Sequence, residues 1–468
     1  MNFKLVILWT DAMVFLLLAV AIAGAWWIKQ RPHLLLPWQR LFKSRVGMVS
    51  MLVLSLFIVI GLLDSLHYRV QLSANGNGQT AYAAEVLSVF DTLAGDLRNH
   101  TEKTYSAPLA VYLYAKESID TADGKMLRDY PRLKYGGSHL LDPQRDHLSD
   151  VIKRSLYGVL AGWLGGVLVA VLIVAVAAAR SRTSPRDWVK ARRNTPLNAM
   201  LATLVLMAML IGLVANLAVA YHVLGTDKVG QDVLYLALKS IRTGLVIGTV
   251  TTLVMLPFAL FLGIAAGYFR GWVDDVIQYI YTVLSSIPGV LLIAAAVLMM
   301  QVTIEKHAEW FSSSVERADL RLLFLCLILG VTSWTGLCRL LRGEALKLRE
   351  LEYIQAAQAF GVSSLRIMSR HILPNVMHIV LITVVMDFSA LVLAEAVLSY
   401  VGVGVDPSTN SFGTLINNAR LEMGREPMVW WTLAAAFGFM LVLVLAANLF
   451  ADAVRDAFDP RLSRTGDA

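Results

Sequence analysis

The sequence predicts an all-α integral membrane protein, a polytopic bundle of about nine spanning helices. Of its 468 residues, 57% are hydrophobic and 16% are charged, whereas soluble domains have about 45–50% apolar and about 25% charged residues. Segments that are long and apolar enough to cross a bilayer recur along the chain, and basic residues concentrate in alternate connections between them. The composition argues against a soluble enzyme or a nucleic-acid-binding protein, despite a net charge of +7.

Nine segments satisfy the requirement of roughly 20 mostly apolar residues for a spanning helix. Because lipid offers the backbone no hydrogen-bond partners, each segment is expected to be helical. They are residues 5–28, 46–66, 155–179, 197–221, 241–267, 276–300, 320–340, 376–400 and 429–452. Pro257 and Pro288 are expected to kink their helices. The first segment has small residues near its end, as a cleaved signal peptide does, but the five basic residues that follow favour an uncleaved helix.

The charges of the connections predict the orientation. Residues 29–45 carry five Lys or Arg and no acid, and residues 180–195 carry six against Asp187 alone. Cytoplasmic loops have such a basic excess, so both are placed inside, and the even number of segments between them agrees. The N-terminus and residues 67–152, 222–240, 301–319 and 401–428 are then outside, and residues 268–275, 341–375 and 453–468 are inside.

Residues 67–152 form the only sizeable soluble part. They hold 9 Lys or Arg and 11 Asp or Glu, and so lack the basic excess of the inside connections. The Asn-Gly pairs of Asn75–Gly78 predict a turn, and Leu109–Tyr114 is a candidate strand. We interpret this segment as a small external domain or an ordered insertion.

Motifs of phosphate binding, hydrolysis and metal binding are absent from the sequence. Gly225 and Gly230 have the glycine spacing of a phosphate-binding loop, but Gln231 and Asp232 follow where a lysine and a hydroxyl are required. No H-E-x-x-H, G-x-S-x-G or Cys/His metal spacing occurs. We therefore expect no catalytic residue, no metal site and no cofactor in this chain.

The strongest functional signal is the cytoplasmic stretch 341–375. Its first half is mostly helix formers, and Gly361 permits the left-handed turn that ends a helix. Ser363 or Ser364 is expected to cap a second helix, and Pro374 to start the next spanning helix, where a missing N–H costs nothing. The pattern predicts either a helix–turn–helix that docks another protein or an ordinary amphipathic loop.

Two runs in this stretch carry a family resemblance. Residues 352–361, E-Y-x-x-A-A-x-x-x-G, and residues 371–375, H-I-L-P-N, resemble the EAA loop of ATP-binding-cassette importer permeases. They are most similar to the second, C-type permease subunit of the dipeptide/oligopeptide/nickel permease family. Residues 222–232, H-x-L-G-T-D-x-x-G-x-D, and the run from Leu393 to Leu462 resemble that family too. The resemblance covers roughly 222–462, and residues 37–63 are similar to the family's first helix.

The resemblance has departures, and it implies a domain organisation. Gln355 stands where the family has the first Glu of its E-A-A core, and Gln231 stands where it has Arg. Residues 1–30 and the pair of helices 155–221 with their preceding loop are extra. The expected units are N-terminal membrane helices (1–66), an external soluble insertion (67–152), two further membrane helices (153–221), an external motif (222–240), a type-I permease core (241–452) and a cytoplasmic tail (453–468).

The resemblance also implies the function: a permease subunit of an ATP-driven, binding-protein-dependent importer in the bacterial inner membrane. Peptides are the expected cargo, with nickel and other solutes left open. The implied partners are two ATPase subunits, which hold ATP and magnesium, a second homologous permease, an external solute-binding protein and membrane lipid, but no nucleic acid. The implied ATPase-coupling residues are Glu352, Tyr353, Ala356, Ala357, Gly361 and Pro374. An ATP-independent channel or secondary transporter is the alternative.

The external motif allows two interpretations. Thr226 or Asp227 is expected to N-cap a helix that carries Val229, Val233 and Leu236 on one face. The motif is then a capped interfacial helix, or an outer gate element that touches the binding protein. The candidate gate residues are Gly225, Thr226, Asp227, Gly230 and Asp232.

Two carboxylates lie within the predicted span 376–400. Asp387 and Glu395 are eight residues apart and roughly share a helical face. Ionisable groups in a span usually face a bundle interior or a cavity. Both are therefore candidates to line the translocation path, with a structural hydrogen bond between helices as the alternative.

Overall fold

A computed structural model describes residues 3–30, 32–72, 82–120, 126–191, 196–307, 309 and 313–458. The strands are β1 (Phe3–Val6), β2 (His67–Val70), β3 (Leu87–Ser88), β4 (Glu117–Asp120) and β5 (Met126–Asp129). The helices before residue 220 are α1 (Trp9–Lys29), α2 (Pro32–Leu41), α3 (Arg45–Asp64), α4 (Val89–Leu93), α5 (Gly95–Asn99), α6 (Pro143–Arg180), α7 (Pro185–Ala191) and α8 (Leu197–Ala218). The later ones are α9 (Val233–Phe269), α10 (Trp272–Ser286), α11 (Gly289–Lys306), α12 (Ser314–Ser333), α13 (Thr335–Arg349), α14 (Glu352–Ala359), α15 (Ser364–Ile367), the π-helical turn η2 (Met368–Ile372), α16 (Leu373–Tyr400), α17 (Phe412–Glu422) and α18 (Trp431–Phe458).

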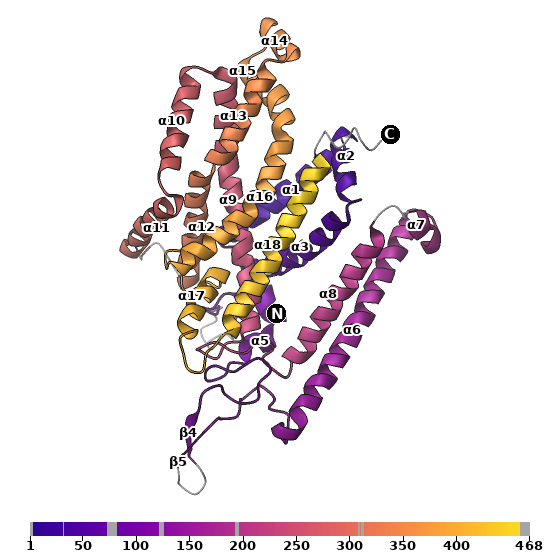
Figure 1. Ribbon diagram of the computed structural model, residues 1–468, viewed down its shortest axis with the longest axis vertical. Coiled ribbons are helices and arrows are strands. Elements are labelled where there is room, and N and C mark those ends of the chain that lie inside the picture. The colour runs from indigo at the N-terminus through magenta and orange to yellow at the C-terminus, as the bar shows by residue number, and fades with distance from the viewer. Residues whose placement is uncertain are drawn as a thin grey trace.

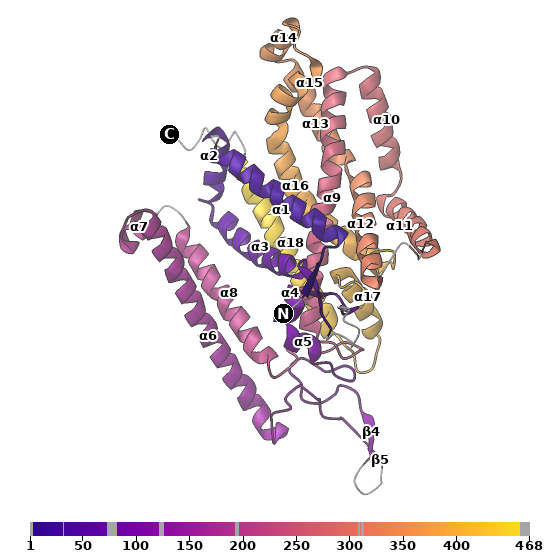
Figure 2. The same cartoon turned by 180° about the vertical axis from the view of Figure 1, so that it is seen from behind.

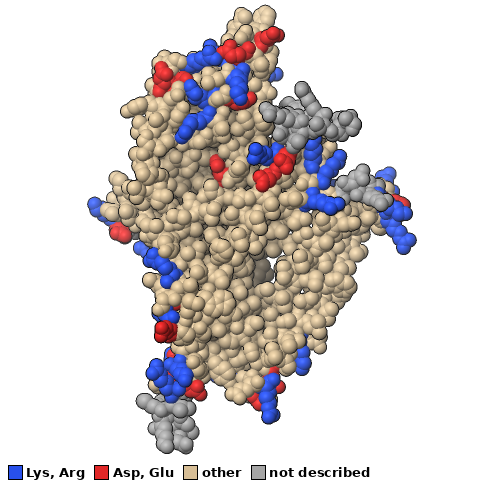
Figure 3. All heavy atoms as spheres, viewed as in Figure 1, with Lys and Arg blue, Asp and Glu red and all other residues tan. Residues whose placement is uncertain are grey.

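The part of the chain that the structure describes has nine helical runs long and apolar enough to cross a membrane, as predicted. On the face drawn in Figure 3, charged side chains gather at the top, along the left edge, at the upper right and at the bottom, and a broad charge-poor band lies between them. A bilayer excludes charges from its hydrocarbon core, so a surface of this kind is suited to contact with lipid.

Helix α9, with 37 residues, is the centre of the bundle, and α12, α13 and α16 pack against it (Figures 1 and 2). Its contact with α13 is close because Gly263 and Gly267 have no side chain. A Cβ atom on Gly263 would lie 2.8 Å from the carbonyl oxygen of Cys338. Small residues allow membrane helices to approach in this way.

The predicted span 276–300 is broken into two helices, which corrects the expectation of a kink within one helix. Helix α10 ends at Ser286 and α11 begins at Gly289. Ile287 is extended, with φ −88° and ψ 131°, because the ring of Pro288 disfavours a helical residue before it. By contrast, α9 runs through Pro257 as one helix.

Helix α6 begins at Pro143, where Asp142 caps it, and so starts ahead of the boundary predicted at residue 152. Helix α6 forms an antiparallel hairpin with α8 beside the main bundle (Figure 1). Gly158 and Gly162 face Gly212 and Ala208 across the hairpin, where a Cβ atom would meet the opposite backbone. Close packing of glycines thus joins the two extra membrane helices.

The described part of the soluble insertion has little regular structure. Leu109–Tyr114 is not a strand, since it has only the isolated bridge between Tyr112 and Arg132, and Leu109 adopts a positive φ of 57°. The strands form instead as the antiparallel pairs β1–β2, β2–β3 and β4–β5. The turn predicted at Asn75–Gly78 lies outside the described residues.

The N-terminal strand β1 pairs with β2, which follows directly after α3. The start of the chain and the insertion therefore lie at one end of the bundle, as the predicted orientation requires. This end, which also carries the N-terminus of α9, is called the outer end below. Helix α14 lies at the opposite, inner end (Figure 1). Helix α18 extends to Phe458 and so includes the first part of the predicted tail 453–468. The rest of that tail lies outside the described residues.

Candidate functional site

The predicted docking loop is a short helix at the tip of the inner end. Glu352, Tyr353 and Ala356 of α14 are exposed, and Ala357 is half-buried. Ile354, on the opposite side, is completely buried in the cluster that α9 and α13 form. One anchored face and one free face are what a docking helix requires.

Gly361 ends α14 with the expected left-handed turn, at φ +76°. Its N–H donates to the carbonyl of Gln358 (3.0 Å), and the N–H of Val362 donates to that of Ala357 (3.1 Å). These two bonds form a Schellman motif, which satisfies the last carbonyls of the helix. Glycine adopts this φ without strain, so the turn that aims the following residues depends on Gly361.

The helix after this turn differs from the prediction in two ways. Ser363 occupies the N-cap position of α15 but makes no side-chain capping bond. Pro374 is in the first turn of α16, as expected, but no break precedes it, because the helical run begins at Ser364 and continues through η2 into α16. In η2 the N–H of Leu373 donates five residues back, to Met368. Such π turns occur as single-turn insertions in α-helices.

Side-chain bonds hold the loop to the bundle. Asn375 Nδ2 donates to the hydroxyl of Tyr353 (3.1 Å), and Gln358 Nε2 donates to the hydroxyl of Tyr268 at the end of α9 (3.2 Å). Arg342 forms a two-pronged ion pair with Asp274 of α10, at 2.5 and 2.8 Å. Movement of the loop is therefore mechanically linked to α9, α10 and α16.

Sequence reasoning missed the apolar surface of the loop. Phe360 is 87% exposed and Leu365 is 68% exposed, on either side of Gly361. The tip of the loop therefore carries two exposed large apolar side chains beside its turn. Phe360 and Leu365 could have been identified in the sequence by their position close to the turn residue Gly361.

At the outer end, the N-cap of α9 is Asp232 rather than Thr226 or Asp227. Asp232 Oδ1 accepts from the N–H groups of Leu234 (2.8 Å) and Tyr235 (3.3 Å). The helix expected within 222–240 is therefore the first two turns of the spanning helix α9. Asp227 instead closes a turn, since its side chain accepts from the N–H groups of Val229 and Gln231, both at 2.9 Å.

The predicted gate motif is mostly interior. A Cβ atom on Gly225 would lie 2.9 Å from Nε1 of Trp431, and one on Gly230 would overlap the backbone of Glu102. Thr226 is completely buried, and its carbonyl accepts from Trp431 Nε1 (3.0 Å). Four of the five candidate gate residues are thus enclosed by the chain's own insertion and α18, and Asp227 is the one that is half-exposed.

A buried charge cluster joins the motif to the insertion. His222 Nδ1 lies 2.7 Å from Asp232 Oδ2, and its Nε2 lies 3.4 Å from Glu102 Oε1. Burial disfavours a charged imidazole, but the two carboxylates outweigh it and raise the pKa of His222 to about 9. Burial likewise opposes ionisation of Glu102, yet His222 and the N–H groups of residues 134–136 lower its pKa to about 2.

The two membrane carboxylates lie in different surroundings. Glu395 is 1% exposed, and its Oε1 accepts from Ser399 Oγ (2.7 Å) beside Ser411 and Gly413 at the start of α17. This is the position of a structural hydrogen bond between α16 and α17. Asp387 is half-buried on α16, one turn or more away from these partners.

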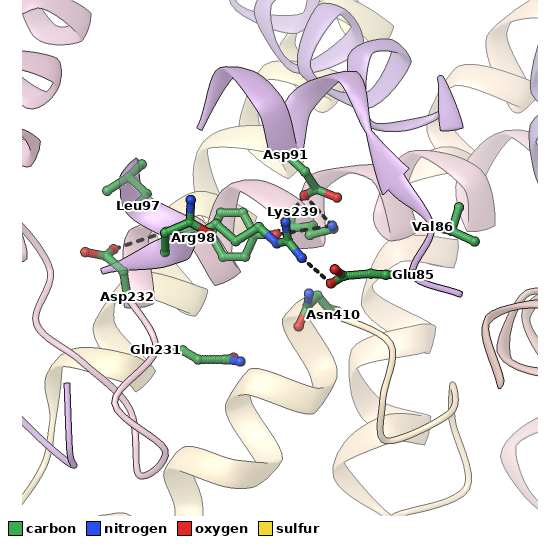
Figure 4. Close-up of a pocket in the computed structure, with 11 residues that line it drawn as sticks. Glu85, Val86, Asp91, Leu97, Arg98, Gln231, Asp232, Lys239 and Asn410 are labelled. Atoms are coloured by element: carbon green, nitrogen blue, oxygen red, sulfur yellow. Dashed lines mark hydrogen bonds and ion pairs between the residues drawn. The ribbon is translucent and has the colours of Figure 1, made fainter. Parts of the chain in front are cut away.

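Two adjoining cavities open at the outer end, with volumes of about 370 and 260 Å³. They share Val86, Lys239 and Asn410 as wall residues. Figure 4 shows the larger one, where Lys239 of α9 lies against Asp91 of α4 and Arg98 of α5 lies against Glu85. No sequence motif predicted these cavities, because the residues come from distant segments.

The smaller cavity has a polar floor that anchors the extra N-terminal helix. Arg242 of α9 lies 2.6 Å from Asp11 of α1 and 3.7 Å from Asp319 of α12. Asp11 also lies 2.7 Å from His67 Nδ1. These buried charges compensate one another, which is the condition for burying them. No group of three or more metal-ligating side chains was found among the described residues.

The helical runs and the charge-poor band define a multi-pass membrane protein. The family of binding-protein-dependent transport system inner membrane components matches residues 259–464. The oligopeptide transport system permease protein OppC of Mycobacterium tuberculosis is 32% identical over 239 residues, which cover 51% of this chain and 76% of that protein. The chain belongs to this permease family, so it is a multi-pass inner-membrane transport subunit rather than an enzyme, and its core is the type-I permease domain.

Two further relatives agree. The glutathione transport system permease protein GsiD of Pectobacterium atrosepticum is 32% identical, over 52% of this chain and 73% of its own length. The dipeptide transport system permease protein DppC of Bacillus subtilis is 28% identical, over 52% and 70%. A solved structure of the inward-facing MetNI methionine ABC transporter aligns with 48% of this chain and 97% of its own, at 15% identity and a TM-score of 0.37. This last likeness is too low to bear on the fold.

Proposed function

We propose that this chain is one of the two permease subunits of an ATP-driven importer of peptides. It forms half of the translocation path, pairs with a second homologous permease, receives cargo from a solute-binding protein at the outer end, and contacts one of two ATPase subunits at the inner end. ATP and magnesium bind those ATPases. Each of the three relatives named above is called a permease for an oligopeptide, a dipeptide or glutathione, which supports short peptides as the cargo.

The observation that carries this proposal is the tip of the docking loop. Phe360 and Leu365 present apolar surface next to the small side chain of Ala356, and Ile354 holds the same helix to the bundle. An amphipathic helix with such anchors seats in a groove of a partner protein. Because Arg342 and Gln358 tie the loop to α10 and α9, closure of the ATPases would move the spanning helices.

A cross-linking experiment tests the contact. Ala356→Cys places a thiol on the exposed face of α14, and Ser184→Cys places one on a different exposed connection that is predicted to face the same side. In membranes that contain the whole transporter, an oxidant or a short bifunctional reagent should join Ala356→Cys to an ATPase subunit and leave Ser184→Cys unjoined. Equal cross-linking of both variants, or of neither, would contradict the docking role and favour the channel or secondary transporter.

A further inference from the structure

The larger outer cavity is built jointly by the insertion and the permease core. Residues 85–99 supply Glu85, Asp91 and Arg98, the external motif supplies Gln231 and Lys239, and the core supplies Asn410. The insertion lies outside the matched family region of 259–464. The cavity is therefore a feature that the extra segment adds to this chain.

The walls combine groups that bind both ends of a small zwitterion. Asp91 Oδ1 lies 2.5 Å from Lys239 Nζ, and the Glu85 carboxylate contacts the Arg98 guanidinium. The Lys239 and Arg98 side chains are 22% and 27% exposed, and Glu85 is 65% exposed. The Asp91 side chain, by contrast, is 4% exposed and also accepts from the hydroxyl of Tyr235 (2.7 Å), so it holds Lys239 in place. Glu85 and Arg98 form the exposed pair. Because solvent-exposed ion pairs contribute little to stability, a ligand's own charges can replace either partner of this pair at small cost.

Neutral hydrogen-bonding groups lie between the charges. Figure 4 shows the side-chain amides of Gln231 and Asn410 on the same side of the cavity, opposite Asp91. Each amide can donate and accept a hydrogen bond, as recognition of a peptide bond requires. The volume of about 370 Å³ lies at the lower end of the range of about 300–1,000 Å³ for small-molecule sites, which suits a very short chain.

We propose that this cavity is a binding site for short peptides with free termini, in which Glu85 receives the ammonium group and Arg98 and Lys239 receive the carboxylate. Gln231 and Asn410 contact the intervening peptide bond. The site lies at the outer end, where cargo arrives before it enters the bundle. This inference rests on the proposed peptide import and adds to it a docking site on the permease itself.

The test uses equilibrium binding of dialanine to the complete transporter in lipid nanodiscs without the solute-binding protein, and uptake of the same peptide by proteoliposomes with it. The probes are dialanine, its N-acetyl form and its C-terminal amide. The variants are Glu85→Gln and Arg98→Gln. The matched controls are Glu117→Gln and Lys103→Gln, which remove the partners of another exposed ion pair of the insertion that does not line the cavity.

Each cavity variant should weaken dialanine binding about tenfold, as expected for the loss of one charge-assisted contact, and the control variants should bind like the wild type. N-acetylation of dialanine should weaken its binding to the wild type but cause little further loss of binding to Glu85→Gln. Amidation of the C-terminus should likewise weaken binding to the wild type but cause little further loss of binding to Arg98→Gln. Such non-additivity shows that the two groups meet.

Two results would overturn the proposal in distinguishable ways. If the wild type takes up dialanine but the cavity variants and controls bind it equally, the cavity is not the site and peptide import stands. If the wild type neither binds nor takes up any of the three probes, peptide import itself fails, and the cavity proposal fails with it.

Discussion

Asp232 accepts a hydrogen bond from His222 with one carboxylate oxygen and caps the N-terminus of α9 with the other. One side chain thus fixes both the start of the central helix and the position of the segment before it. Glu102 of the insertion lies on the other side of the same imidazole. Through these buried contacts, the family-like motif of residues 222–232 joins the external insertion to the central helix α9.

This arrangement predicts a pH dependence of stability. The folded-state pKa of His222, about 9, is above its ordinary value of 6.5, so its stabilisation is complete below about pH 6.5 and is lost as pH rises through about 9. The pKa of Glu102, about 2, is below its ordinary 4.5, so its contribution is complete above about pH 4.5 and is lost as pH falls through about 2. Between about pH 4.5 and 6.5 the stabilising contributions of both His222 and Glu102 are complete.

The measurement is the unfolding temperature of the detergent-solubilised protein. It should fall between about pH 6.5 and about pH 9 in the wild type and change less in His222→Gln. His100→Gln is the control, because His100 is on the same external segment but stacks on Tyr135. If His222→Gln kept the full wild-type slope, the buried charge cluster would not be the cause.

The turn at Gly361 predicts a coupling defect. Gly361→Val forces a β-branched side chain into a left-handed conformation, at a cost of roughly 1–2 kcal/mol, and misaims Phe360 and Leu365. Transport-coupled ATPase activity and ATPase association should fall while membrane insertion persists. Gly343→Ala, in α13 with open space around it, should be near wild type. Full coupled activity in Gly361→Val would remove Gly361 from the coupling role.

The orientation predicts opposite accessibility for two exposed serines. Ser118 lies on β4 at the outer end, and Ser184 lies at the connection between α6 and α7 (Figure 1). In intact cells, an impermeant thiol reagent should label Ser118→Cys and spare Ser184→Cys. The reverse pattern would place the docking loop outside and overturn its assignment.

The position of Glu395 predicts a structural role. Glu395→Gln keeps the shape and an acceptor for Ser399, so transport and cargo preference should stay close to wild type. Glu395→Leu leaves buried donors around α17 without a partner, at about 1–3 kcal/mol each, and should lower thermal stability. A changed cargo preference in Glu395→Gln, with stability intact, would support the path role instead. Asp387→Asn, assayed alongside, tests that role for the second carboxylate.

Hydropathy and charge were sufficient to predict the nine spanning runs, because the bilayer imposes both the length and the helical form. Pro288 was expected to kink its helix rather than to break it. The start of α6 at Pro143 was missed because its first turns are polar and precede the apolar segment. The turn at Gly361 was predicted because its cause is local: only glycine adopts that φ freely.

The outer end was less predictable. The cap at Asp232 was assigned to its neighbours Thr226 and Asp227, since all three residue types cap helices and the sequence does not rank them. His222 and Arg242 have partners that are distant in the sequence, such as Glu102, Asp11 and Asp319. No periodic sequence pattern predicts such contacts. The cavities that they border therefore could not be predicted from the sequence.

The most direct test of the central claim is peptide uptake by the reconstituted transporter. Proteoliposomes that contain this chain, its partner permease and the ATPase subunits are given labelled dialanine with and without the solute-binding protein, and with ATP or a non-hydrolysable analogue inside. The account predicts accumulation against a gradient only when both ATP hydrolysis and the binding protein are present, and its loss in Gly361→Val. Uptake that proceeds without ATP or without the binding protein would contradict it.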